Sequence, residues 1–186
     1  MRRWCNRTAV YPDGKLYMNS LITKWCRRIV ASLFFIGYFP VAPGTIGSAL
    51  TVTAIWFLHG RYPAFFNPAQ PLIFWIASLA LIAVSIYLSN DAAGVFGRDD
   101  PPQIIIDECA GQCITFFLVP LSLHTLVLGF ALFRFFDVVK PFPVYKLEDL
   151  EDGVGVTMDD VAAGVMSNLS IHAVIFIYHV IRAWLS

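Results

Sequence analysis

The sequence predicts an all-α, multi-pass helical membrane protein with about five to six membrane-embedded helices, including a short or re-entrant first helix. Composition is the first observation: 58% of the 186 residues are hydrophobic, only 14% are charged, and the mean hydropathy is +0.66. Soluble domains carry about 25% charged residues. The second observation is that apolar segments alternate along the chain with short polar loops.

The apolar segments follow one another as membrane-embedded helices would. The first, about 29–39, is too short to span and stops at PVAPGT, where two prolines and a glycine break any helix. The second, about 46–59, is also short. The third, 71–90, is long enough to cross a bilayer, which takes about 20 residues. The remaining three cover about 104–119, 122–139 and 161–185. No repeat or linker indicates a second domain, so 29–186 is predicted to be a single membrane-embedded domain.

Charge is distributed unevenly although the net charge is zero. Residues 1–28 hold seven of the thirteen basic residues and one acid, and the other twelve acids lie between Asp91 and Asp160. This predicts a basic N-terminal arm, 1–28, on the cytoplasmic side near anionic headgroups. The arm is too long for the start of a signal peptide, and no basic stripe suited to nucleic acid follows it.

With the N-terminus inside, the segments can be threaded through the membrane in order. If 29–39 is re-entrant, the later crossings place 90–103 and 138–160 on the cytoplasmic side. Every acidic stretch after residue 90 then reaches the same face of the membrane. Acids in or near a membrane are costly unless they are paired, hydrated or bound to metal, so these acids are functional candidates.

Three separate stretches supply these acids at predicted helix ends. Asp107 and Glu108 open the fourth segment, Asp137 lies near the end of the fifth, and Asp159 and Asp160 open the last. Taken singly, the acids at helix starts could be caps or dipole partners. Together, oxygen-only side chains favour a hard cation such as Mg²⁺. The four cysteines fit neither a disulfide framework nor a zinc pattern.

Two further stretches could bind phosphate. LFRFFDVVKPFP places Arg134, Asp137 and Lys140 three residues apart, either as a salt-bridge ladder or as half of a reaction site. PVAPGTIGS is either a kinked connection or a helix start whose N–H groups face an anion. Thr45 and Ser48 are its candidate substrate-binding residues. Motifs of thiol, aspartyl-phosphate and histidine-dependent phosphatases and the P-loop do not occur in the sequence.

Four motifs in this order resemble the phosphatidylglycerophosphatase A family: PVAPGTIGS (40–48), IIDECAGQ (105–112), FRFFDVVKPFP (133–143) and GVGVTMDDVAAGV (153–165). The resemblance implies a Mg²⁺-dependent, all-helical enzyme of the bacterial inner membrane, with its active site on the cytoplasmic face. Its substrate would be phosphatidylglycerophosphate in the lipid bilayer, and its product phosphatidylglycerol.

Carried over by motif, the resemblance assigns roles to residues of this chain. The expected metal ligands are Asp107, Glu108, Asp137, Asp159 and Asp160; the catalytic residues are Asp107, Asp137, Asp160 and Lys140; the substrate-binding residues are Arg134, Lys140, Thr45 and Ser48. One or two Mg²⁺ ions would activate water, with Asp160 or Asp107 as general base, and a covalent aspartyl-phosphate route stays open.

Two other interpretations belong to different classes. A non-catalytic membrane scaffold or transporter subunit would explain the helices, but not the acids and cations gathered on one face. A phosphotransferase acting on CDP-lipids would explain the acids, although the D-G-x2-A-R tract of that class does not occur in the sequence.

Overall fold

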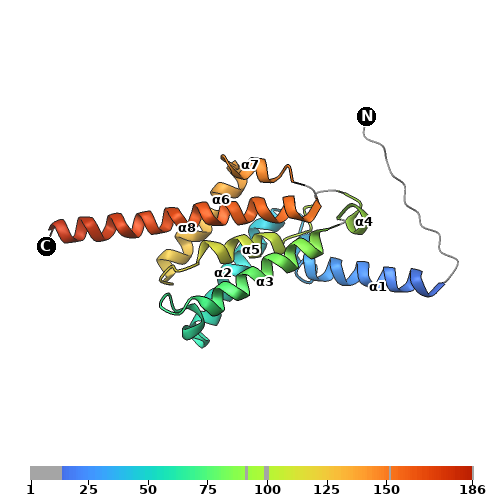
Figure 1. Cartoon of the computed structure of the whole chain (residues 1–186), viewed down its shortest axis with the longest axis horizontal. Coiled ribbons are helices and arrows are strands. Elements are labelled where there is room, and N and C mark those ends of the chain that lie inside the picture. Colours follow the sequence, from blue (N-terminus) through green and yellow to red (C-terminus); the bar gives the residue numbers. More distant parts are fainter. Residues whose placement is uncertain (1–13, 91, 99–100, 151, 186) are drawn as a thin grey trace.

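The computed structural model describes residues 14–90, 92–98, 101–150 and 152–185, and within these ranges all regular structure is helical (Figure 1). The longer helices are α1 (Gly14–Ala31), α2 (Pro43–Arg61), α3 (Leu72–Ser89), α5 (Ile106–Thr115), α6 (Leu123–Val139) and α8 (Asp152–Leu185). The shorter elements are α4 (Ala92–Phe96), α7 (Val144–Leu147) and the 3-10 turns η1 (Ile36–Tyr38) and η2 (Pro63–Phe66). The predicted all-α fold is confirmed.

Helix α5 lies at the centre of the bundle. It has only ten residues, and α2, α3, α6 and α8 all pack against it. Helix α8 is by far the longest at 34 residues, and its C-terminal half runs out beyond the other helices (Figure 1). A short helix enclosed on several sides can carry buried polar side chains, because neighbouring helices shield it from both lipid and water.

The apolar core lies at one end of this bundle. Aromatic and aliphatic side chains of α2, η2, α3, α6, α8 and the turn that follows α5 meet there, namely Ile55, Phe66, Phe74, Phe116, Val119, Leu126 and Ile171. The rings of Trp75 and Phe117 pack beside them, with centroids 4.7 Å apart. The predicted site residues lie about ten residues away along each helix, or roughly 15 Å. This cluster therefore fixes the helices at one end. At the other end the polar groups lie beside a second, smaller apolar cluster, made up of Ala31, Leu88, Ala92, Ile104 and Ile106.

Glycines allow α5 and α8 to approach until their backbones touch. A Cβ atom on Gly164 would collide with the carbonyl oxygen of Gly111. A Cβ atom on Gly111 would lie 2.6 Å from a ring carbon of Phe133, and against the backbone of Asp160. Small residues are the usual means by which membrane helices reach such close contact. This contact sets the position of the first turn of α5 relative to Asp160.

The start of α8 is held on the end of α3. The Ser85 and Thr157 hydroxyls hydrogen-bond at 2.8 Å, and the Asn90 side chain accepts the N–H of Gly153 at 3.1 Å. A Cβ atom on Gly153 would collide with the carbonyl oxygen of Ile86. The glycines of the GVGV stretch therefore serve close packing within a helix.

Several predicted elements match the structure and others differ. The segments 71–90 and 122–139 are α3 and α6, and Ser122 caps α6 through a reciprocal pair of hydrogen bonds with Thr125. The prediction that the last helix covers 161–185 is wrong at its start, because the helix already begins at Asp152. The segment 104–119 is wrong in length, because the regular α-helix covers only Ile106–Thr115.

The predicted short first helix, 29–39, is also wrong. Helix α1 ends at Ala31, and Leu33, Phe34 and Phe35 then take left-handed backbone angles before η1. Left-handed residues cannot continue a right-handed helix. The predicted division between arm and domain falls inside α1, and residues 1–13 of that arm lie outside the described residues; the division stays a prediction.

Two helices in the described part of the chain are long and apolar enough to cross a membrane. They are Leu72–Ser89 and Gly153–Leu185, with mean hydropathies of 2.3 and 1.7. Only 28% and 22%, respectively, of the apolar windows in these helices are buried inside the protein. Their apolar surfaces are thus available to a bilayer.

Adding a methyl group at the α5–α8 contact tests how closely these helices must pack. We expect Gly111→Ala and Gly164→Ala each to destabilise the protein by about 1–3 kcal/mol, because the new Cβ atom meets backbone. Thermal unfolding in detergent measures this. Gly60→Ala is the matched control, because nothing lies within 4 Å of a Cβ atom there. Equal melting temperatures for all three variants would contradict the close contact.

Candidate active site

Four helices bring polar side chains to the end of the bundle opposite the apolar core. Helices α2 and α5 contribute their first turns, α6 contributes its last turn, and α8 contributes residues two turns into the helix. The site therefore draws on all four sequence motifs, which are separated by up to about a hundred residues along the chain.

Three carboxylates form the centre of this site. Asp107 and Glu108 of α5 and Asp160 of α8 each offer an oxygen, and these oxygens all lie within 4.8 Å of one another. Asp107 is 6% exposed, Asp160 is 5% exposed, and Glu108 is half-buried. We call these three residues the acidic cluster. Glu108 Oε2 and Asp160 Oδ1 are buried without a hydrogen-bond partner among the described residues.

The negative charges of the acidic cluster are not balanced by an ion-paired cation among the described residues. Asp107 and Asp160 are almost fully shielded from solvent, and each has an oxygen within 4.8 Å of an oxygen of Glu108. Ionised carboxylates this close together and this buried need positive charge nearby. The donor set contains only oxygens, which is the ligand type preferred by Mg²⁺ and similar hard cations. The residues present therefore fit a divalent cation.

Arg134 lies beside this cluster, and its guanidinium contacts the side chains of Asp137 and Ser48. Its Nη1 is 2.6 Å from Asp137 Oδ2 within α6 and 3.5 Å from the Ser48 hydroxyl of α2. Asp137 is thus occupied with Arg134 and is not one of the three clustered acids. The i, i+3 pair predicted as one rung of a ladder is present, and it aims the guanidinium across the gap toward α2.

The first turn of α2 needs a glycine at this point. A Cβ atom on Gly44 would collide with Glu108 Oε1 and would lie 3.3 Å from Arg134 Nη1. Glu108 therefore reaches the N-terminus of α2, where the helix dipole and free N–H groups favour negative charge. Thr45 is half-buried in the same turn. The sequence analysis predicted Thr45 and Ser48 as residues of the site. It did not predict that Gly44 is needed to leave space for Glu108.

Lys140 forms a second, separate charged group. It ends α6 in a left-handed conformation, with φ 45°, and its Nζ is 2.9 Å from Asp159 Oδ2 and 3.1 Å from Glu148 Oε2. Burial alone would lower the pKa of Lys140, but the hydrogen bonds that its ammonium group donates to Asp159 and Glu148, with the negative charges of these carboxylates, outweigh burial and raise the pKa. The ammonium group therefore stays charged between the two carboxylates.

Asp159 and Asp160 point to different partners although they are adjacent. Asp160 joins the acidic cluster, whereas Asp159 pairs with Lys140 and also accepts the Asp160 N–H at 2.9 Å. The interpretation of both as helix caps is wrong, because α8 begins at Asp152. Glu148, which the sequence left in a solvated acidic loop, is the other partner of Lys140. Nothing in the local sequence pattern signals that pairing.

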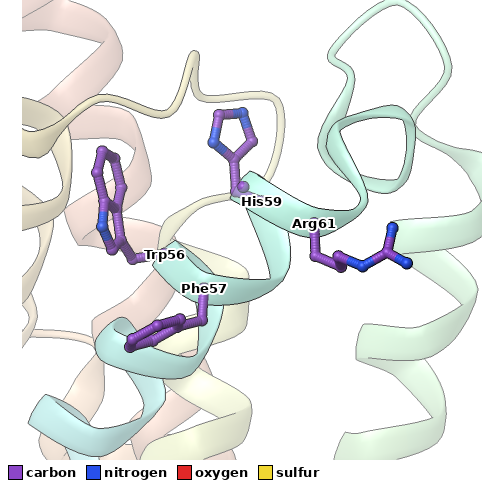
Figure 2. Close-up of a pocket in the computed structure, with 5 residues that line it drawn as sticks. Trp56, Phe57, His59 and Arg61 are labelled. Carbon is purple, nitrogen blue, oxygen red and sulfur yellow. The ribbon is translucent and has the colours of Figure 1, made fainter.

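A depression of about 360 Å³ lies at the other end of α2. Trp56, Phe57, His59, Gly60 and Arg61 line it. Figure 2 shows these side chains fanning out from the last turns of the helix without converging on one point. This end of α2 is roughly 20 Å from Gly44 along the helix axis. The chain has no acid between residues 14 and 90, so the depression has no carboxylate of α2 with which to hold a cation.

Comparison with known proteins gives consistent matches. Residues 29–175 match the family described as Phosphatidylglycerophosphatase A. The chain is 31% identical to "Phosphatidylglycerophosphatase A" of Escherichia coli over 75% of this chain and 78% of that protein. It is 34% identical to the Haemophilus influenzae protein of the same name, over 79% and 87% of the two chains. It is 38% identical to a "Putative phosphatidylinositol-3-phosphatase" of Bacteroides thetaiotaomicron, over 75% and 87%. No solved structure matches the chain.

Adding a divalent cation tests whether the acidic cluster holds one. We expect Mg²⁺ to raise the melting temperature, because binding to the folded state alone stabilises it, by about 2.7 kcal/mol at a hundred times Kd. Asp160→Asn should largely remove this shift. Glu148→Gln is the control, because Glu148 contacts Lys140 and lies outside the cluster. An equal Mg²⁺ shift in wild type and Asp160→Asn would contradict binding at the cluster.

Proposed function

The chain belongs to the phosphatidylglycerophosphatase A family and is a phosphatase, and on that premise we propose that it hydrolyses the terminal phosphomonoester of phosphatidylglycerophosphate with the help of Mg²⁺. The products are phosphatidylglycerol and inorganic phosphate. The observation that carries this proposal is the buried acidic cluster of Asp107, Glu108 and Asp160 with Arg134 beside it. Carboxylates that hold a cation next to a guanidinium form a complementary site for a phosphate dianion.

Each group in the site would have a role in binding or in the reaction, and Asp160 would have two. Asp107, Glu108 and Asp160 would hold the divalent cation. When bound, such a cation withdraws charge from phosphoryl oxygens and makes a nearby water molecule more acidic. Arg134, held in place by Asp137 and Ser48, would contact the phosphate through its guanidinium. Lys140 would supply a second positive charge at the rim, where Glu148 is the more exposed of its two partners.

Asp160 is our candidate for the general base. Its Oδ1 is buried without a partner, whereas Asp107 Oδ1 already accepts the Glu108 N–H at 3.0 Å. A base must have a free oxygen within reach of the water whose proton it takes. Asp159 is unsuited to this role, because both of its oxygens are engaged by Lys140 and by the Asp160 N–H. Asp159 instead fixes Lys140 beside the site.

We place the enzyme in the bacterial inner membrane as a multi-pass protein, with the acidic cluster on the cytoplasmic face. Helices α3 and α8 support this by length and apolar character. Helices α2 and α6, of 19 and 17 residues, are about 25–28 Å long, close to the hydrocarbon thickness of about 30 Å. With α5 enclosed among them, five membrane-embedded helices result. The basic residues before the bundle favour a cytoplasmic N-terminus.

Phosphate release from the purified protein tests the reaction. We expect release from phosphatidylglycerophosphate with Mg²⁺, none with a chelator, and at least a hundredfold slower release by Asp160→Asn because the cation and the base are both impaired. Asp149→Asn is the matched control, since Asp149 is an exposed acid in a nearby loop. Phosphatidylinositol 3-phosphate, after the name of the Bacteroides relative, is the comparison lipid. Full activity of Asp160→Asn would contradict the assignment.

Labelling of introduced cysteines from each side of the membrane tests the orientation. In a background with Cys5 and Cys26 replaced by serine, we expect Leu150→Cys to react with an impermeant maleimide from the cytoplasmic side. Gly60→Cys, at the opposite end of α2, should react only from the outer side. The proposed orientation is wrong if residue 150 is labelled from outside while residue 60 is not.

A further inference from the structure

Buried polar side chains in this protein are almost all paired within it. The hydroxyls of Ser48, Ser78 and Ser167 donate to carbonyl oxygens one turn earlier, and the Asn168 amide donates to the Thr115 and Phe117 carbonyl oxygens at 3.1 and 2.7 Å. The buried side-chain atoms without a partner in the described residues are Arg27 Nε, Ser89 Oγ, Glu108 Oε2, Asp160 Oδ1 and both amide atoms of Gln112. Four of these six atoms belong to the acidic cluster or to Gln112.

Gln112 is the more unusual of these residues. It is 0% exposed, yet neither its Oε1 nor its Nε2 has a hydrogen-bond partner. A carboxamide closed off from water without partners is costly, and an apolar side chain of similar size would avoid that cost. Gln112 is therefore poorly explained as packing. Asn168, the comparable amide on α8, is fully explained by its two carbonyl partners.

The geometry of α5 directs Gln112 toward the acidic cluster. Gln112 follows Glu108 by four residues on the same helix, so both side chains lie on one face. Helical side chains tilt toward the N-terminus of their helix. The Gln112 carboxamide is thus directed to the turn that carries Asp107 and Glu108, from the interior of the bundle. Glu108 and Gln112 thus share a face of α5, and an oxygen of Asp160 on α8 lies within 4.8 Å of an oxygen of Glu108.

We propose that Gln112 is a member of the cation and phosphate site, supplying a neutral oxygen beneath the acidic cluster. Glutamine oxygens are suitable ligands for hard cations. The amide N–H₂ would then remain as a donor for a phosphate oxygen. A neutral donor is suited to this position, because a fourth carboxylate would add repulsion to three acids that already lie within 4.8 Å of each other. This inference rests on the proposed cation dependence of the enzyme.

Binding of Mn²⁺ to the full-length protein in detergent, followed by electron paramagnetic resonance of the free ion, tests this role without relying on activity. We expect Gln112→Met to weaken Mn²⁺ binding by about tenfold or more, the usual effect of losing a group that supports a metal site. Its metal-free melting temperature should not fall, because two unpaired polar atoms leave the interior. Gln112→Glu restores an oxygen donor and should bind Mn²⁺ more tightly than Gln112→Met.

Asn168→Leu is the control for removing an amide that is half-buried and hydrogen-bonded. It should lower the melting temperature, because two carbonyl oxygens lose their donor, and should leave Mn²⁺ affinity unchanged. Wild-type affinity in Gln112→Met, or in Gln112→Leu if the methionine variant does not fold, contradicts the role of Gln112 while leaving the phosphatase proposal intact. If the wild-type protein itself binds no Mn²⁺, both proposals fail together.

Discussion

The contact between α5 and α8 at Gly111 and Gly164 is the constraint on which the site depends. The two backbones touch there, with no space for even a methyl group on either glycine. Asp107 and Asp160 each lie four residues before one of these glycines, which is about one helical turn. The contact therefore brings carboxylates from helices about fifty residues apart in the chain to within a few ångströms of each other.

The charges around this contact form two ion-paired groups and one cluster of acids. Arg134 is balanced by Asp137, and Lys140 is balanced by Asp159 and Glu148. The acidic cluster has no cation of its own within hydrogen-bond distance among the described residues. Glu108 Oε2 and Asp160 Oδ1 have no partner among the described residues, and three acidic side chains lie with oxygens within 4.8 Å of one another. A bound divalent cation removes both costs, which is why we regard the cluster as the metal position and the Arg134 and Lys140 groups as the phosphate position.

Much of this arrangement could be predicted from the sequence. The apolar runs with clear polar ends predicted the bounds of α3 and α6 to within about one residue. Asp107 and Glu108 lie in the first turn of their helix, as expected. The start of α8 could not be predicted, because the sequence GVGVT is typical of a loop. In the structure Gly153 allows close packing against the end of α3, and Gly155 packs against the backbone of Glu148 and Leu150. The separation of Asp159 from Asp160 also depends on tertiary structure. Neighbouring helical residues point about 100° apart, but only the packed bundle determines which one faces α5.

The membrane location that we propose would explain why so much charge is placed at one end of the bundle. Helices α3 and α8 are apolar and mostly not buried inside the protein, whereas the polar groups lie where α2 and α5 begin and α6 ends. In the proposed orientation, a phospholipid would remain in the bilayer while its phosphate reaches the acidic cluster from the headgroup region. The left-handed residue at Lys140, followed by Pro141, ends α6 at this level and turns the chain toward α7.

The most direct measurement is the position of a bound metal ion, located by anomalous scattering from crystals grown with Mn²⁺. We expect one peak between α5 and α8, with carboxylate oxygens of Asp107, Glu108 or Asp160 at about 2.0–2.3 Å. Two results would contradict the assignment of the acidic cluster as the metal site. One is a peak between Asp159 and Glu148, where the Lys140 ammonium group lies in this structure. The other is the lack of a peak between α5 and α8 in a protein that is active with Mn²⁺.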